Sequence, residues 1–171
     1  IELYSGAKSR KRLIDTRFLY ALSPYESMTR LSLIRPYQWY KNLFVFLALV
    51  FSGNLLNLHA VGLAFIAFAS FCALSSATYV INDCADRKLD ALNPEKRNRP
   101  IAAGTISVKN GIWIATLLTL IGFGLSLSLP LSFTLCALGY FLLSQLYTLF
   151  LKHQAFADII TISLNFVLRA V

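Results

Sequence analysis

The stretch that decides the fold is TYVINDCADRKLDALNPEKRNRPIAAG, residues 78–104. Its first residues end an apolar run long enough to cross a bilayer, and the acidic pattern N-D-x-x-D-x-x-x-D follows directly. On a helix, Asp83, Asp86 and Asp90 stand at i, i+3 and i+7, so we expect all three carboxylates to project from one face. Three like charges so close together repel one another unless a cation lies among them, and ligands that are all oxygen suit Mg²⁺.

Basic residues stand beside and behind these acids: Arg87, Lys88, Lys96, Arg97 and Arg99. Acids that hold Mg²⁺, next to bases that hold phosphate oxygens, predict a site for a diphosphate. Each half also has a simpler interpretation, because acids at a helix end can form a solvated rim and Lys or Arg can merely set membrane topology. Ionisable residues at membrane helices more often mark function, so the acids and bases together favour the diphosphate site.

The composition is that of a membrane protein. Of the 171 residues, 57% are hydrophobic and 14% are charged, and the mean hydropathy is +0.62; average proteins carry about 25% charged residues. The net charge of +8 does not indicate a nucleic-acid partner, because such long apolar runs are foreign to nucleic-acid binders. Cys72, Cys84 and Cys136 are interpreted as small core residues, and His59 and His153 are too far apart to suggest zinc.

The hydropathy pattern predicts an all-α, polytopic transmembrane helical bundle. We expect five helical spans, at residues 36–52, 58–81, 108–128, 131–151 and 155–171. The first apolar run is short, so that helix crosses only if its aromatic end lies in the interface, where Lys41 can extend its ammonium group toward water.

The 16 Lys and Arg residues set the expected orientation. Eight precede the apolar run at residue 43, six lie between residues 87 and 109, and the last two are Lys152 and Arg169. The loops 52–57 and 126–130 have none. Each basic cluster thus falls on one side of the alternation, which the positive-inside rule makes cytoplasmic, together with the N-terminus and the active site.

Residues 1–30 are expected to form a separate segment from the transmembrane domain at residues 31–171. They are basic and polar, with no cleavable-signal pattern, so they predict either an amphipathic helix on an anionic membrane surface or a linker. With no initiator Met, and with an apolar run at its end, we expect the chain to be a piece of a longer protein.

A second polar group is expected on the same cytoplasmic side, in YTLFLKHQAFAD, residues 147–158. Tyr147 and Lys152 can both reach the mouth of the bundle, where Lys152 would bind a phosphate or simply extend to the interface. Asp158 lies one turn inside an apolar helix, where an unpaired carboxylate is costly, so it either forms a structural ion pair or contacts substrate.

Two i, i+4 pairs of polar residues occur inside apolar segments. Asn165 and Arg169 are costly in a membrane unless they face the bundle interior, so we expect Arg169 to be paired or functional. Gln38 and Asn42 put polar groups on one face of the first helix, near its cytoplasmic end, and are expected to line the same pocket.

The acidic pattern followed by NPEKRNRPIAAG, residues 93–104, resembles the first signature of the UbiA-type polyprenyl transferase superfamily. RPYQWYKNLFVF at 35–46, and YTLFLKHQAFAD with LRAV at 168–171, resemble the decaprenyl-phosphate phosphoribosyltransferase branch. The resemblance covers residues 34–171. It implies a nine-helix bundle of which this chain supplies the first five helices, without the second acidic region of the later helices.

The branch resemblance implies Mg²⁺-dependent transfer of a 5-phosphoribosyl group from phosphoribosyl diphosphate, a soluble donor, to a polyprenyl phosphate in the membrane. This step would serve the synthesis of cell-envelope precursor lipids in a bacterial-type inner (plasma) membrane. The metal ligands would be Asn82, Asp83, Asp86 and Asp90. Tyr147 and Lys152 join the acids as catalytic residues, and the implied substrate contacts are Lys41, Asn42, Asn82, Lys96, Arg97, Arg99, Asp158 and Arg169.

Two other functions are compatible with the sequence. An aromatic prenyltransferase of quinone or haem synthesis, in the same superfamily, would use a similar metal site. A transporter or membrane scaffold would use the acids for ion coupling, but it has no need of a phosphate-type basic loop beside them.

Overall fold

The computed structural model describes residues 31–153 and 157–170, and these residues are helical with no strand among them. The expected segment at residues 1–30 lies outside the described part. The elements in chain order are η1 Pro36–Phe44, α3 Val45–Phe51, α4 Leu58–Leu92, α5 Val108–Ser126, α6 Leu131–Leu149, η2 Leu151–His153 and α7 Ala157–Ala170. The expected all-α bundle is therefore confirmed.

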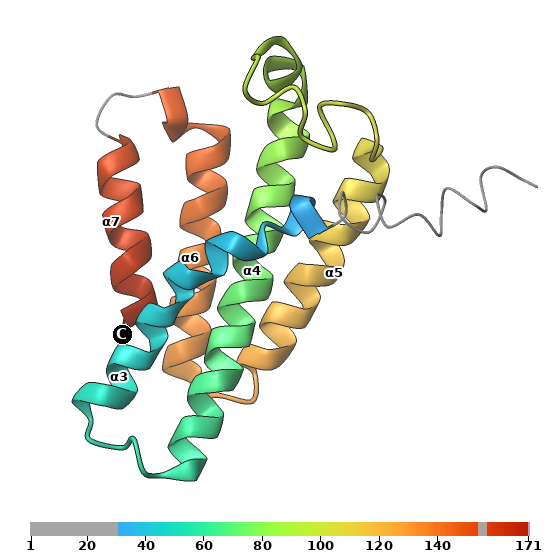
Figure 1. The fold of residues 1–171 in the computed structure, drawn as a ribbon. Coiled ribbons are helices and arrows are strands. Elements are labelled where there is room, and N and C mark those ends of the chain that lie inside the picture. The colour runs from blue at the N-terminus through green and yellow to red at the C-terminus, as the bar shows by residue number, and fades with distance from the viewer. Residues whose placement is uncertain (1–30, 154–156, 171) are drawn as a thin grey trace, which may run out of the picture.

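Helix α4 is the centre of this bundle. It packs against α5 on one side and α6 on the other, while α7 lies beyond α6 and also packs on α3 (Figure 1). Helices α4, α5 and α6 are each long and apolar enough to cross a membrane. The first expected span corresponds to η1 followed by the seven-residue α3, and the fifth corresponds to α7, which has fourteen residues in the described part.

The first segment differs from the single helix expected at residues 36–52. Arg35 has a left-handed backbone (φ 50°), Pro36 follows it, and nine residues then form the 3₁₀-helix η1 before α3 begins. This tighter winding turns Asn42 and Trp39 toward α4, where the Trp39 indole donates to Ser76 Oγ at 3.0 Å. The segment η1–α3 consequently crosses α4 obliquely (Figure 1).

Helix α4 is longer than the span expected at residues 58–81 and runs for 35 residues to Leu92. It begins at Asn57, whose side chain accepts from the amides of His59 and Ala60. It ends at Asn93, which is extended because the proline that follows disfavours the helical conformation. The acidic pattern therefore belongs to the last turns of a continuous helix.

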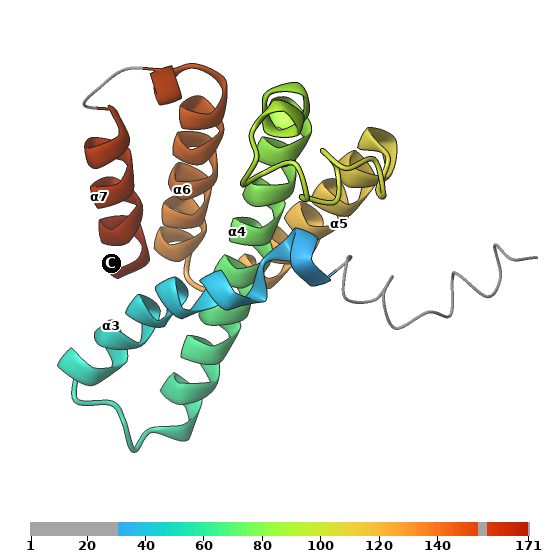
Figure 2. The ribbon, with the colours of Figure 1, turned by 45° about the horizontal axis from the view of Figure 1, so that its top comes forward.

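Close packing between α4 and α5 fixes the position of the loop that joins them. A Cβ on Gly122 would lie 2.6 Å from Leu74 Cγ, and Ser70 Oγ donates to the Gly122 carbonyl at 2.8 Å. Near the other end, Ile101 of the loop is 4% exposed and packs with Val80 and Ala115. The loop therefore lies over the adjoining ends of α4 and α5, close to the acids (Figure 2).

Candidate functional site

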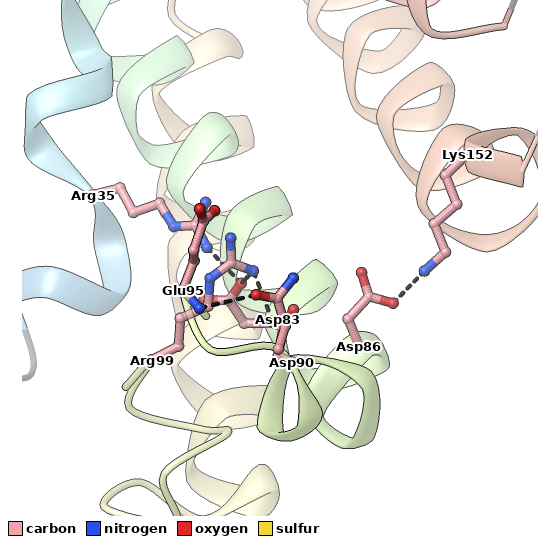
Figure 3. Close-up of polar contacts among 8 residues, drawn as sticks. Arg35, Asp83, Asp86, Asp90, Glu95, Arg99 and Lys152 are labelled. Carbon is pink, nitrogen blue, oxygen red and sulfur yellow. Dashed lines mark hydrogen bonds and ion pairs between the residues drawn. The ribbon is translucent and has the colours of Figure 1, made fainter. Parts of the chain in front are cut away.

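Two of the three acids share one guanidinium group. Arg99 Nη1 lies 3.1 Å from Asp83 Oδ1 and 2.7 Å from Asp90 Oδ2, and Arg35 Nη2 lies 2.5 Å from the same Asp83 oxygen (Figure 3). Asp83 is 2% exposed and Asp90 is 3% exposed. Two buried carboxylates are thus neutralised by arginines that join α4 to the loop and to the start of η1.

Asp86 points elsewhere and pairs with Lys152 of η2 (Figure 3). At about 100° per residue, position i+7 returns to within about 20° of Asp83, whereas position i+3 is rotated by about 60°. That rotation is enough for Asp86 to meet a cation from α6 and η2 instead of Arg99. In this structure the three carboxylates pair with cations on two sides of α4, and the described residues contain no cluster of three or more His, Cys, Asp or Glu that could hold a metal, so the expected ligand set stays a prediction.

A polar cavity of about 290 Å³ lies among η1, α4, α6 and α7. Tyr79 and Asn82 line it from α4, and Asp86 stands one turn beyond Asn82 on that helix. The other lining side chains are Arg35, Lys41, Thr78, Tyr140, Ser144, Tyr147, Thr148, Thr161, Ile162, Asn165, Phe166 and Arg169. The acidic pattern is thereby divided between a loop side, with Asp83 and Asp90 at Arg99, and a cavity side, with Asn82 in the cavity lining and Asp86 one turn beyond it at Lys152.

The cavity side has the donor chemistry for Mg²⁺. Mg²⁺ is usually held by one or two carboxylates plus water and substrate phosphates, so the Asp86 carboxylate and the Asn82 amide oxygen suffice as protein ligands. Asp83 and Asp90 are buried and paired with Arg99, whereas Asp86 is paired with Lys152 but its side chain is 18% exposed, so it is the more accessible to a metal. These oxygen donors therefore fit Mg²⁺, and Asn82 and Asp86 are two of the four metal ligands expected from the sequence.

The cavity carries an excess of positive charge. Arg35 stacks over Tyr79 at 5.0 Å from the ring centroid and is neutralised by Asp83. Lys41 and Arg169 also line the cavity, and neither has an ion-pair partner among the described side chains. Such an interior is suited to an anionic ligand.

Several expected substrate contacts lie elsewhere. Asn42 is fully buried and donates to Ser75 Oγ at 3.2 Å and to Cys72 Sγ at 3.3 Å, so it fastens η1 to α4 instead of lining the cavity. Lys96 and Arg97 are exposed on the loop. The side chain of Asp158 lies outside the described part, whereas Tyr147 lines the cavity as expected.

Among the charged and tyrosine side chains of the site, Arg35, Tyr79 and Tyr140 were not expected from the sequence. Arg35 belongs to a basic cluster that is fully accounted for by membrane topology, and the two tyrosines lie within apolar helices. One signal was present: Tyr79 precedes Asn82 by three residues, which places it on the same side of α4.

The UbiA prenyltransferase family model matches residues 42–171. The chain is 37% identical over 142 residues to a decaprenyl-phosphate phosphoribosyltransferase from Mycolicibacterium smegmatis, covering 81% of this chain and 45% of that protein. It is 42% identical over 81 residues to a protoheme IX farnesyltransferase from Colwellia psychrerythraea, covering 46% of this chain and 26% of that protein.

Among solved structures, a UbiA homolog from Archaeoglobus fulgidus bound to GPP and Mg²⁺ has the same fold, with a TM-score of 0.67 and 23% identity. The match covers 83% of this chain and 51% of that chain. The chain spans between about a third and a half of the length of the curated relatives with the strongest matches.

Proposed function

We propose that this chain, which belongs to the UbiA prenyltransferase family, is part of a Mg²⁺-dependent transferase acting within the membrane. The proposed reaction moves a 5-phosphoribosyl group from phosphoribosyl diphosphate to a polyprenyl phosphate. The observation that carries this proposal is the cavity lined by Asn82 and by Lys41 and Arg169, two cations without a described ion-pair partner, with Asp86 one turn beyond Asn82 on α4.

In the reaction, the bond between the anomeric carbon and the diphosphate oxygen breaks, and the lipid phosphate oxygen bonds to that carbon from the opposite face. Asn82 and Asp86 would hold Mg²⁺, which when bound supplies neutralisation of charge on the leaving group. A phosphate nucleophile is already ionised, so no strong general base is required.

The remaining site residues bind and orient. Tyr147 lines the cavity and Lys152 lies at Asp86, so both are placed to contact donor phosphates. Lys96 and Arg97 are exposed on the loop and can meet the same anion from the water side. Asp83, Asp90 and Arg99 hold that loop on α4, which positions these two cations.

The lengths of the matches favour transfer of a phosphoribosyl group over transfer of a prenyl group. The match to the phosphoribosyltransferase spans 81% of this chain, against 46% for the match to the farnesyltransferase. The second candidate is therefore transfer of a prenyl group from its diphosphate to an aromatic ring. It rests on the higher identity within the shorter match.

The test uses the full-length protein that contains this chain, in detergent with Mg²⁺. Radiolabelled phosphoribosyl diphosphate and polyprenyl phosphate should yield a labelled lipid, and chelation of Mg²⁺ should abolish it. His59→Ala, at the exposed opposite end of α4, is the matched control for Asp86→Asn. Absence of labelled lipid, together with prenylation of an aromatic acceptor, would replace the first candidate with the second.

The family and the three apolar helices make the chain part of an integral membrane protein. We place loop 93–107 on the cytoplasmic side of a bacterial-type inner membrane, because the loop is basic and the α3–α4 connection has no Lys or Arg. In a cysteine-free background, a maleimide reagent that cannot cross membranes should label Asn54→Cys in intact cells. It should label Asn98→Cys only in inverted vesicles.

A further inference from the structure

We propose that Arg169 holds the phosphate of the lipid acceptor, at the junction between the polar cavity and a neighbouring apolar cavity that takes the acceptor's hydrocarbon chain. The inference rests on the proposed function and deepens it, because it assigns one end of the cavity to one substrate. Arg169 lines both cavities, and its Nε has no hydrogen-bond partner.

The second cavity has a volume of about 330 Å³ and lies among α3, α4, α6 and α7. Its walls are almost wholly apolar and include Leu49, Ala64, Phe71 and Phe133. Among the residues that the structure describes, only Arg169 lines both this cavity and the polar one. A ligand with an anionic head and an apolar tail would be held with its charge at Arg169 and its chain beyond it.

The Arg169 side chain is buried and only partly satisfied. The residue is 7% exposed, its Nη2 donates to Tyr140 Oη at 3.0 Å, and its Nε has no hydrogen-bond partner. A guanidinium group has five N–H donors and no described carboxylate pairs with this one. Because a buried charge without a counter-charge is costly, the geometry favours an anion at this position.

Neighbouring groups contact the guanidinium group of Arg169 and place a second positive charge in the same cavity. The Tyr140 ring lies 4.6 Å from the guanidinium carbon and packs edge-on against Phe71 at 5.4 Å. Lys41 lines the same cavity as Arg169, and two like charges in one cavity repel each other. An anion bound between Lys41 and Arg169 would relieve that repulsion.

This position is separated from the metal-binding side of the cavity. Arg169 and Tyr79 line the same cavity, and Asp86 is seven residues beyond Tyr79 on α4, which corresponds to about 10 Å along the helix axis. A ribosyl group between the two phosphates would occupy that interval. The donor diphosphate at Asp86 and the acceptor phosphate at Arg169 would thus face the reacting carbon from opposite sides.

The same anion chemistry could instead come from the 5-phosphate of the donor. We assign the lipid phosphate because Arg169 also lines the apolar cavity, whereas Arg35 and Lys41, the other cations that line the polar cavity, do not. The two sources differ in which substrate loses affinity when Arg169 is changed. They also differ in whether the length of the hydrocarbon chain matters.

The test measures the binding of each substrate separately in the full-length protein, the lipid without Mg²⁺ and the donor with it. Polyprenyl phosphate should raise the thermal unfolding temperature of the wild type, and Arg169→Gln should weaken its affinity about 10- to 100-fold while leaving polyprenol binding unchanged. Arg169→Lys keeps the charge but loses the planar fork of donors, so its affinity for polyprenyl phosphate should lie between those of the wild type and of Arg169→Gln. Loss of affinity for phosphoribosyl diphosphate, with lipid binding intact, would overturn the assignment.

A second variant covers the case in which Arg169→Gln does not fold. Ala64→Leu narrows the apolar cavity without touching Arg169, and should weaken binding of a long-chain polyprenyl phosphate but spare a short-chain one. Equal effects on both chain lengths would overturn the placement of the chain. If binding behaves as expected but no phosphoribosyl lipid forms, the proposed function fails while the phosphate site stands.

Discussion

Lys152 pairs with Asp86 across 66 positions of sequence, and this contact joins the short helix η2 to the last turns of α4. Both side chains are 18% exposed, so the pair lies between a surface contact and a buried one. It brings the end of α6 to the side of α4 that we propose holds Mg²⁺.

We predict different effects on folding and activity when this pair is exchanged. Lys152→Met should destabilise the full-length protein by about 1–2 kcal/mol, between the values for exposed and buried pairs. The double variant Asp86→Lys with Lys152→Asp should recover that stability but not the labelled lipid product. Thermal unfolding and the transfer assay check this, and recovery of activity by the exchange would rule out Asp86 as a metal ligand.

Arg99 is predicted to hold the loop on α4 through its two carboxylate partners. Arg99→Ala leaves Asp90 buried without its cation, so we expect a loss of about 2–4 kcal/mol. We also expect faster proteolysis within residues 93–107. The neighbouring Arg97→Ala is the matched control, since Arg97 is exposed and should change stability by less than about 0.5 kcal/mol. Equal proteolysis of the two variants would contradict the prediction.

The packing between α4 and α5 can be tested with two glycines of one helix. Gly122→Ala forces Leu74, which is fully buried, to move, and should destabilise the protein by about 1–3 kcal/mol. Gly124→Ala meets nothing within 4 Å and should be neutral or slightly stabilising, because alanine favours the helix. Thermal unfolding of both variants decides the matter, and a neutral Gly122→Ala would show that the helices separate easily.

Asn42 is predicted to act through the position of η1. In a double-mutant cycle, Asn42→Ala and Ser75→Ala should show a coupling of about 0.5–1 kcal/mol in unfolding free energy, because they remove the two ends of one hydrogen bond. If Asn42 contacted substrate instead, Asn42→Ala would raise a KM without changing stability and the coupling would be near zero.

The helical layout was largely predictable because apolar runs and their end signals are local. The expected spans 108–128 and 131–151 match α5 and α6 at their first residues, where Ser107 caps α5 and Pro130 precedes α6. The 3₁₀ form of η1 was not predictable, because it depends on how Asn42 and Trp39 meet α4. Tertiary contacts there override the local pattern.

The candidate site was predictable in its residue types but not in its geometry. Spacing puts Asp83, Asp86 and Asp90 within about 60° of one another, which fits one metal cluster as well as two separate ion pairs. The outcome depends on Arg99 and Lys152, which approach α4 from different sides. Sequence spacing carries no information about the direction of those approaches.

The length of α4 also bears on how two unlike substrates could meet. Thirty-five helical residues measure about 52 Å, whereas the hydrocarbon layer of a bilayer is about 30 Å thick. An upright α4 therefore extends beyond the hydrocarbon layer, and we expect its charged last turns to be the part that lies outside it. A soluble sugar phosphate could then reach these turns from the water. The phosphate head of a membrane lipid could approach them from the interface, while its hydrocarbon chain stays in the bilayer.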